Sequence, residues 1–166
     1  MRPTTGCSGR RCAPAEPGLG DQNRFARWNL YPPNGEQGMD KAFAEHFTAD
    51  WIESWNAHDL DRVLSHYADE FEMTSPFIIQ LTGESSGRLC GKVSVGAYWG
   101  KALQLIPDLH FELVSVLIGV GSITIYYKGA GSRLAAEVFF FDADRKVSRA
   151  FAHYGVEAVP KLHDRN

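Results

Sequence analysis

Residues 134–156 read LAAEVFFFDADRKVSRAFAHYGV. Two apolar runs in this stretch, Leu134–Asp142 and Val147–Val156, are rich in Val, Phe and Tyr, residue types that strands favour. The polar spacer Asp142–Arg145 between them is as short as a hairpin connection. The stretch therefore predicts two strands that follow one another in the chain and pair antiparallel.

The residues just before this stretch continue the pattern. Leu109–Ile118 and Ser122–Lys128 are further runs rich in β-branched and aromatic residues. The connections are the glycine-bearing spacers Gly119–Gly121 and Gly129–Gly131. Because such short spacers join sequential strands, we expect all four runs to form consecutive antiparallel hairpins.

The N-terminal half has a helical period instead. A helix begins at Asp40 and ends at Asn56–Asp59, because its apolar residues recur at spacings of three and four. Asp59 is placed to cap a second helix, and Gly91 begins a third helix that Pro107 stops. The apolar stripe of the first helix consists of Phe43, Phe47, Trp51, Ile52 and Trp55.

The segment between the second and third helices has mixed signals. Glu70–Thr74 alternates like a strand, which Ser75 and Pro76 break. Residues 79–90 are mostly polar and contain glycine, and they predict a loop. Helices that precede a run of strands are typical of an α+β domain whose helices pack on one face of the sheet.

Composition excludes several classes of function. The chain has 166 residues and a net charge of −3, whereas a nucleic-acid-binding domain is usually clearly basic. No apolar run is long enough to span a membrane. Cys90 is the one cysteine after residue 38, and the histidines lack metal-ligand spacing, so we expect neither disulfides nor a metal site. A reducing, cytoplasmic setting follows from the cysteine usage.

The first residues differ in composition from the rest. Residues 1–38 are rich in Gly and Pro and have neither a helical nor a strand period, which favours disorder. We therefore expect a disordered extension at 1–38, upstream of an alternative start at Met39. A folded domain at 39–160 and a short tail at 161–166 follow.

Four local motifs follow one another in the same order as in a known family. They are WNAHDLDRVL at 55–64, HYADEFEMTSP at 66–76, the helix from Gly91 through Tyr98 and Trp99, and FFFDADRKV at 139–147. Together they resemble SnoaL-like proteins and their nuclear transport factor 2-like relatives, over residues 40–157. The family usually has glycine at the position of Arg145.

The resemblance implies the architecture of the domain. The expected fold is an α+β cone in which three helices pack on the concave face of a strongly curved, mainly antiparallel mixed sheet. An apolar pocket then lies between the helices and the sheet. The fold alone does not fix an activity, because cyclases, isomerases, hydrolases, dehydratases and transport factors share it.

The family's ketosteroid isomerases suggest which residue is catalytic. In those enzymes a catalytic base, a tyrosine and a protonated acid act together. The corresponding positions of this sequence are occupied by Ser75, Trp51 and Glu137, in that order. Neither Ser nor Trp can take over the first two roles, so this resemblance implies no steroid isomerisation by that mechanism. Glu137 remains as a general acid or base. The alternative is a structural Glu137 paired with Arg149 or Arg133 at a subunit interface.

We expect an apolar small-molecule ligand, bound without a cofactor in an aromatic pocket. The candidate pocket residues are Trp51, Trp55, Tyr67, Ser75, Tyr98, Trp99, Tyr127, Phe139 and Tyr154. Aromatic residues at helical or strand spacing usually belong to the core, but this fold cannot fill its cone completely, so we expect some of them to line a cavity. Period-two alternation places His153 on the opposite, outer face of the sheet.

The sequence leaves three kinds of function open. The first is a cofactor-free acid/base enzyme of the isomerase, cyclase, dehydratase or hydrolase type. The second is a non-catalytic ligand-binding module, and the third is a protein-association module. The outer sheet face carries Val138, Phe140 and Phe151, which predicts a homodimer through that face.

Overall fold

The computed structural model describes residues 39–157. The expectations for residues 1–38, for the last residues of the domain and for the tail at 161–166 lie outside the described residues. The elements are α1 (Lys41–Asn56), α2 (Leu60–Ser65), β1 (Tyr67–Thr74), α3 (Pro76–Thr82), β2 (Arg88–Cys90), α4 (Lys92–Leu105), β3 (Glu112–Gly119), β4 (Ser122–Lys128), the 3₁₀ turn η2 (Ala130–Ser132), β5 (Leu134–Phe141) and β6 (Val147–Tyr154).

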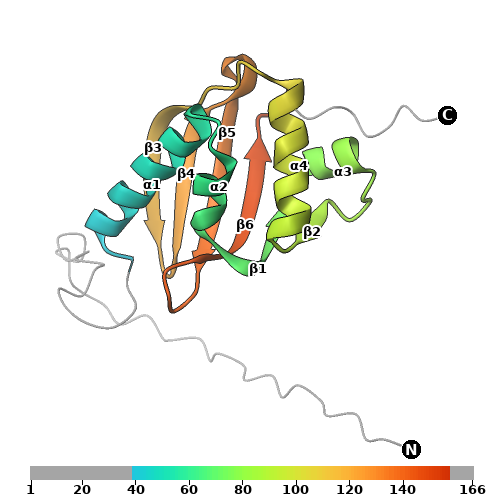
Figure 1. Ribbon diagram of the computed structural model, residues 1–166. Coiled ribbons are helices and arrows are strands. Elements are labelled where there is room, and N and C mark those ends of the chain that lie inside the picture. The colour runs from blue at the N-terminus through green and yellow to red at the C-terminus, as the bar shows by residue number, and fades with distance from the viewer. Residues whose placement is uncertain (1–38, 158–166) are drawn as a thin grey trace, which may run out of the picture. The chain divides into compact units, whose positions relative to one another are not determined.

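The strands form one open sheet in the order β2-β1-β6-β5-β4-β3. All neighbours pair antiparallel except β1 and β6, which are parallel. Helices α1, α2 and α4 lie on the same face of the sheet, and α3 follows beside α4 (Figure 1). The α+β prediction is confirmed, with a mixed sheet and the expected hairpins in its second half.

Two of the predicted helix starts depend on aspartates. The Asp40 carboxylate accepts the Phe43 amide at 2.6 Å and begins α1. The Asp59 carboxylate accepts the Arg62 amide at 3.0 Å and begins α2. Each cap satisfies a backbone donor that the first helical turn leaves free.

The loop predicted at 79–90 is wrong in part, because the structure has α3 and β2 there. Ser75 ends the preceding strand and also caps α3, since its hydroxyl oxygen accepts the Phe77 amide at 3.2 Å. Pro76 stands at the first helical position, where the missing amide costs nothing. Gly83, with φ of 79°, ends the helix in the left-handed region. The proline that breaks the strand therefore also begins a helix.

The core lies between α1 and the inner sheet face. Phe47 and Trp51 of α1 are buried and contact the ring of Phe139 at centroid distances of 5.1 and 5.3 Å. Along β5, Ala135, Glu137 and Phe139 are buried on this inner face, and the residues between them are half-buried on the outer face. The alternation predicted for this strand is confirmed.

The hairpin between β5 and β6 explains the unusual Arg145. Its φ is 57°, a region that favours glycine. Asp142 shapes this turn, since its carboxylate accepts the amides of Asp144 and Lys146, both at 2.9 Å. Arg145 also lies 4.8 Å above the Phe43 ring and pairs with Asp40 at 3.3 Å. The arginine thus gains contacts to the start of α1 that glycine could not make.

Candidate functional site

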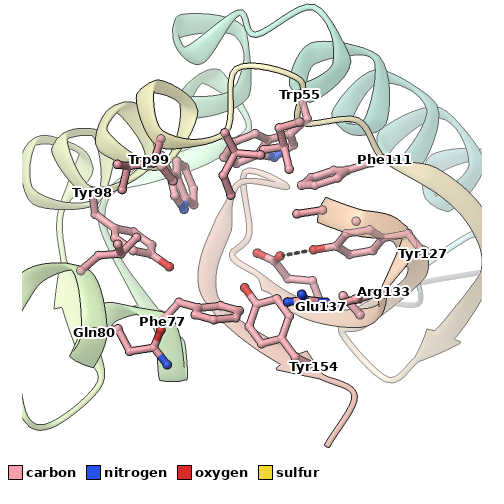
Figure 2. A pocket seen from close by; sticks show the side chains of 18 of the residues that line it. Trp55, Phe77, Gln80, Tyr98, Trp99, Phe111, Tyr127, Arg133, Glu137 and Tyr154 are labelled. Carbon is pink, nitrogen blue, oxygen red and sulfur yellow. Dashed lines mark hydrogen bonds between the residues drawn. The ribbon is translucent and has the colours of Figure 1, made fainter. Parts of the chain in front are cut away.

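A cavity of about 320 Å³ opens between α3, α4 and the inner face of the sheet. Figure 2 shows its side chains converging from these elements, with Trp99 and Tyr98 facing Tyr127 and Glu137 across the open space. Most of the wall is aromatic or aliphatic, and its volume lies in the range of small-molecule sites. The cavity is therefore large enough for a small apolar ligand.

Of the residues that the structure describes, Glu137 is the one carboxylic acid that lines the cavity. It is 5% exposed, and among residues 39–157 it forms no ion pair. The Tyr127 hydroxyl donates to its Oε2 over a long 3.5 Å. Burial raises the pKa of Glu137 to about 8, and the bond from Tyr127 opposes only part of that rise. At neutral pH the carboxyl group is mostly protonated.

Tyrosine hydroxyls surround the acid. Tyr98 donates to the Ser75 hydroxyl at 3.4 Å, and the Tyr154 ring packs edge-on against Phe77 at 4.4 Å. Burial raises the pKa of Tyr98, and more strongly that of Tyr154, so both remain neutral hydroxyl groups. The site therefore offers several neutral hydrogen-bond donors in an apolar setting.

The structure brings most of the expected side chains together. Trp55, Tyr98, Trp99, Tyr127 and Tyr154 line the cavity with Glu137. Trp51, Tyr67, Ser75 and Phe139 do not line it but lie fully buried behind it. The indole of Trp51 donates to the Tyr67 hydroxyl at 3.0 Å, so both polar groups are satisfied inside the core. These four residues fill the space between helices and sheet.

The ion-pair alternative for Glu137 does not match the structure. Arg149 lies on the outer face, 4.6 Å above the ring of Phe140, while Glu137 points inward. Arg133 reaches the cavity wall but makes no ion pair with Glu137 or another carboxylate of residues 39–157. His153 is exposed and lies outside the cavity wall.

Sequence reasoning missed part of the wall. Phe77, Gln80 and Leu81 enter it from α3, and Leu105 and Ile106 close it at the end of α4. The first three could have been found from the capping sequence Ser75-Pro76, which marks a helix start. Arg133 follows the turn η2, and nothing local in the sequence directs it to the cavity.

A polar clamp fixes the part of the wall before β3. Asn56, at the end of α1, donates to the Phe111 carbonyl at 3.0 Å and accepts the Phe111 amide at 2.7 Å. His58 bonds the Leu109 carbonyl through Nε2 at 2.8 Å. Because Leu109 and Phe111 line the cavity, this clamp couples the helix end to the wall. Sequence reasoning took Asn56 only as the end of a helix.

No group of three or more His, Cys, Asp or Glu side chains within residues 39–157 is placed to hold a metal ion. No helix in that part of the structure has the length and apolar character to cross a membrane.

Comparison with known proteins gives a family and a fold. The model of the SnoaL-like domain matches residues 48–158. A SnoaL-like protein of unknown function from Burkholderia thailandensis has 59% identity and a TM-score of 0.70, covering 71% of this chain and 98% of that one. No curated protein matches the sequence.

More distant structures share the fold alone. The epoxide hydrolase/cyclase-like enzyme SalBIII has 12% identity and a TM-score of 0.56, covering 71% of this chain and 95% of its own. AclR, a putative hydroxylase from Streptomyces galilaeus, has 14% identity and a TM-score of 0.55, covering 70% and 91%. The architecture thus occurs in proteins named as enzymes.

Proposed function

The chain belongs to the SnoaL-like domain family, and from that premise we propose that it is a cofactor-free acid/base enzyme acting on an apolar, carbonyl-bearing small molecule. One observation carries the proposal. Glu137 is a buried acid without an ion pair among the described residues, at the wall of an aromatic cavity. Two proteins of the same fold are named as an epoxide hydrolase/cyclase-like enzyme and a putative hydroxylase, so the fold is compatible with catalysis.

The pKa of Glu137 suits proton transfer. A catalytic acid or base works best when its pKa is near the operating pH, because both forms are then available. A pKa of about 8 lets Glu137 hold a proton at neutral pH and release it at little cost. The free-energy cost of burying an isolated carboxylate in an apolar wall is far greater than that of burying the neutral acid.

The surrounding groups define the reaction. The Glu137 carboxylate takes a proton from the carbon next to the ligand carbonyl, and the carbon–hydrogen electron pair becomes a carbon–carbon double bond. The carbonyl pair moves to oxygen, and a tyrosine hydroxyl donates a hydrogen bond to it, either that of Tyr154 or that of Tyr98 once it turns from Ser75 to the ligand. The protonated Glu137 then returns the proton to the same carbon or to a conjugated one. The first outcome is exchange and the second is isomerisation.

Deuterium exchange tests this proposal without knowledge of the natural substrate. The probes are uncharged aryl ketones, 1-indanone and 1-tetralone, whose hydrogens next to the carbonyl are followed by NMR in heavy water. We expect wild-type protein to accelerate their exchange, with a rate that rises with pH through the Glu137 pKa of about 8. Glu137→Gln should lower the acceleration by about 10²-fold or more, the scale of a lost general base.

The matched control is Glu45→Gln, which makes the same chemical change on the solvent side of α1 and should leave the rate unchanged. If the ketones bind but exchange no faster than in buffer, the protein is a binding module and not an enzyme. If Glu137→Gln exchanges as fast as wild type, Glu137 is not the base.

A further inference from the structure

Among residues 39–157, two ionisable side chains besides the tyrosines line the cavity, namely Glu137 and Arg133. Both lie on β5 or directly before it, four residues apart. Because side chains alternate along a strand, Arg133, Ala135 and Glu137 share the inner face. Their order along the strand is cation, small apolar residue, acid.

The spacing of the two groups defines a length. Four residues of extended strand span roughly 13 Å between Cα atoms, at about 3.3 Å per residue. Ala135 between them is buried and lines the cavity, and its methyl group leaves the floor between the two polar side chains open. Figure 2 shows Arg133 on the same side of the cavity as Glu137 and Tyr154. A ligand lying along this floor meets both groups.

The charge balance of the cavity decides what Arg133 can bind. Within residues 39–157, the Arg133 guanidinium makes neither an ion pair nor a hydrogen bond, and it is exposed at the cavity rim. Since Glu137 is mostly protonated at neutral pH, the wall carries one uncompensated positive charge. A guanidinium matches a carboxylate through two parallel hydrogen bonds. One cation balances a monoanion rather than a phosphate dianion.

We propose that the ligand of this cavity is an amphipathic monocarboxylate, whose carboxylate binds Arg133 at the rim while its carbonyl oxygen lies among the hydroxyl groups near Glu137. The apolar part of the ligand fills the space over Ala135, between the rings of Trp99 and Tyr127. This inference rests on the proposed function and adds the chemical class and the orientation of the substrate. Arg133 is then a specificity-determining residue.

Calorimetry with ω-benzoyl alkanoates of increasing chain length tests this assignment. Each acid carries an aryl ketone at one end and a carboxylate at the other, and its primary amide is the matched uncharged probe. We expect the best acid to bind wild-type protein roughly fivefold more tightly than its amide, the upper end for an exposed ion pair. The preference should shrink with added salt. Affinity should be greatest over a narrow range of intermediate chain lengths, because the strand sets the Cα separation of Arg133 and Glu137.

The variant Arg133→Gln should remove the preference for acids and leave amide binding unchanged. Arg88→Gln, which removes an exposed cation from β2 outside the cavity wall, is the control and should keep the preference. The proposal is overturned if acids and amides bind wild-type protein equally, if Arg133→Gln keeps the preference, or if no acid binds at millimolar concentration. The two tests can fail independently. If only the proposed catalysis is wrong, Glu137→Gln leaves the deuterium-exchange rate unchanged, while wild-type protein still binds acids more tightly than amides.

Discussion

At the scale of single residues, the protonation state of Glu137 is set by its burial and by the lack of an ion-pair partner among residues 39–157. The side chain is buried in an apolar wall, and the hydrogen bond that it accepts from Tyr127 is long. A buried carboxylate without a cation is costly, so the acid keeps its proton instead. The same burial that makes Glu137 a candidate catalyst therefore couples folding to pH.

The first prediction is a pH-dependent stability difference between wild type and Glu137→Gln. The folded pKa of Glu137, about 8, lies above its ordinary value of 4.5, so the folded state holds a proton that the unfolded state has lost between these values. The unfolding free energy of wild type should therefore fall relative to the variant as pH rises from about 4.5 to about 8. The full loss is of the order of 5 kcal/mol, at about 1.36 kcal/mol per pKa unit.

Urea denaturation at a series of pH values measures this difference, with Glu45→Gln as the exposed control. Below pH 4.5, wild type and Glu137→Gln should have similar stability, because Glu137 is then protonated in both the folded and the unfolded state. A difference that stays constant from pH 5 to pH 8 would mean that Glu137 is ionised in the folded protein.

The sequence pattern predicted which side chains share a sheet face better than it predicted which of them reach the cavity. Period-two alternation correctly placed Glu137 and Phe139 on one shared face of β5, but it left open whether that face was the inner one. It could not show that Phe139 lies behind the cavity while Glu137 lines it, because depth depends on the rings of Phe47 and Trp51 that pack from α1. Strand periodicity gives direction only, and packing between distant elements decides what remains open.

At the scale of elements, the clamp between α1 and the segment before β3 joins parts far apart in the chain. Asn56 makes two bonds to the Phe111 backbone, and no local pattern predicts a contact between residues so distant in sequence. Local chemistry did suffice to predict the cap at Asp59, because a cap and its amide lie within one turn. The same local rule would have found α3 from Ser75.

The second prediction concerns this clamp. Asn56→Ala leaves the Phe111 amide and carbonyl without partners in a half-buried place, so the unfolding free energy should fall by about 2 kcal/mol. Asn56→Asp keeps the acceptor for the amide and should cost less. Because Phe111 lines the cavity, benzoyl alkanoate binding should weaken in Asn56→Ala as well.

Urea denaturation followed by tryptophan fluorescence gives the stability change, and calorimetry gives the binding change. His58→Ala is the matched comparison, since it removes a single bond to the neighbouring Leu109 carbonyl. Equal stability of wild type and Asn56→Ala would show that water replaces the clamp without loss.

At the scale of the whole molecule, the outer face of the sheet is the surface most suited to contact a second subunit. Among the described residues, α1, α2 and α4 lie on the other face (Figure 1). The outer face carries Val138, Phe140 and Phe151, and the last two rings touch at a centroid distance of 5.9 Å. Leu117 of β3 is 59% exposed. Apolar side chains gathered on one sheet face are typical of a protein interface.

The third prediction is that this face forms a two-fold homodimer. The double substitution Leu117→Asp with Phe151→Asp should give a folded monomer, because it places two charges in the apolar contact. Val120→Asp is the control, since Val120 is 99% exposed at the β3–β4 turn and its charge stays in water. Light scattering at micromolar concentration measures the mass. A monomeric wild type would contradict the prediction.

The parallel pairing of β1 with β6 has a consequence for the order of folding. β6 lies between β1 and β5, so Tyr67 meets Val147 across almost the whole length of the sheet-forming chain. Hairpins such as β3–β4 close short loops quickly, whereas this contact must close a long one. We expect the amides of the β1–β6 ladder to gain protection last in pulse-labelling hydrogen exchange during refolding, after the amides bonded within the β3–β4 and β5–β6 hairpins. Until β1 pairs with β6, the sheet is incomplete on the side that α4 covers. The cavity between α4 and the inner sheet face therefore forms only at this last step.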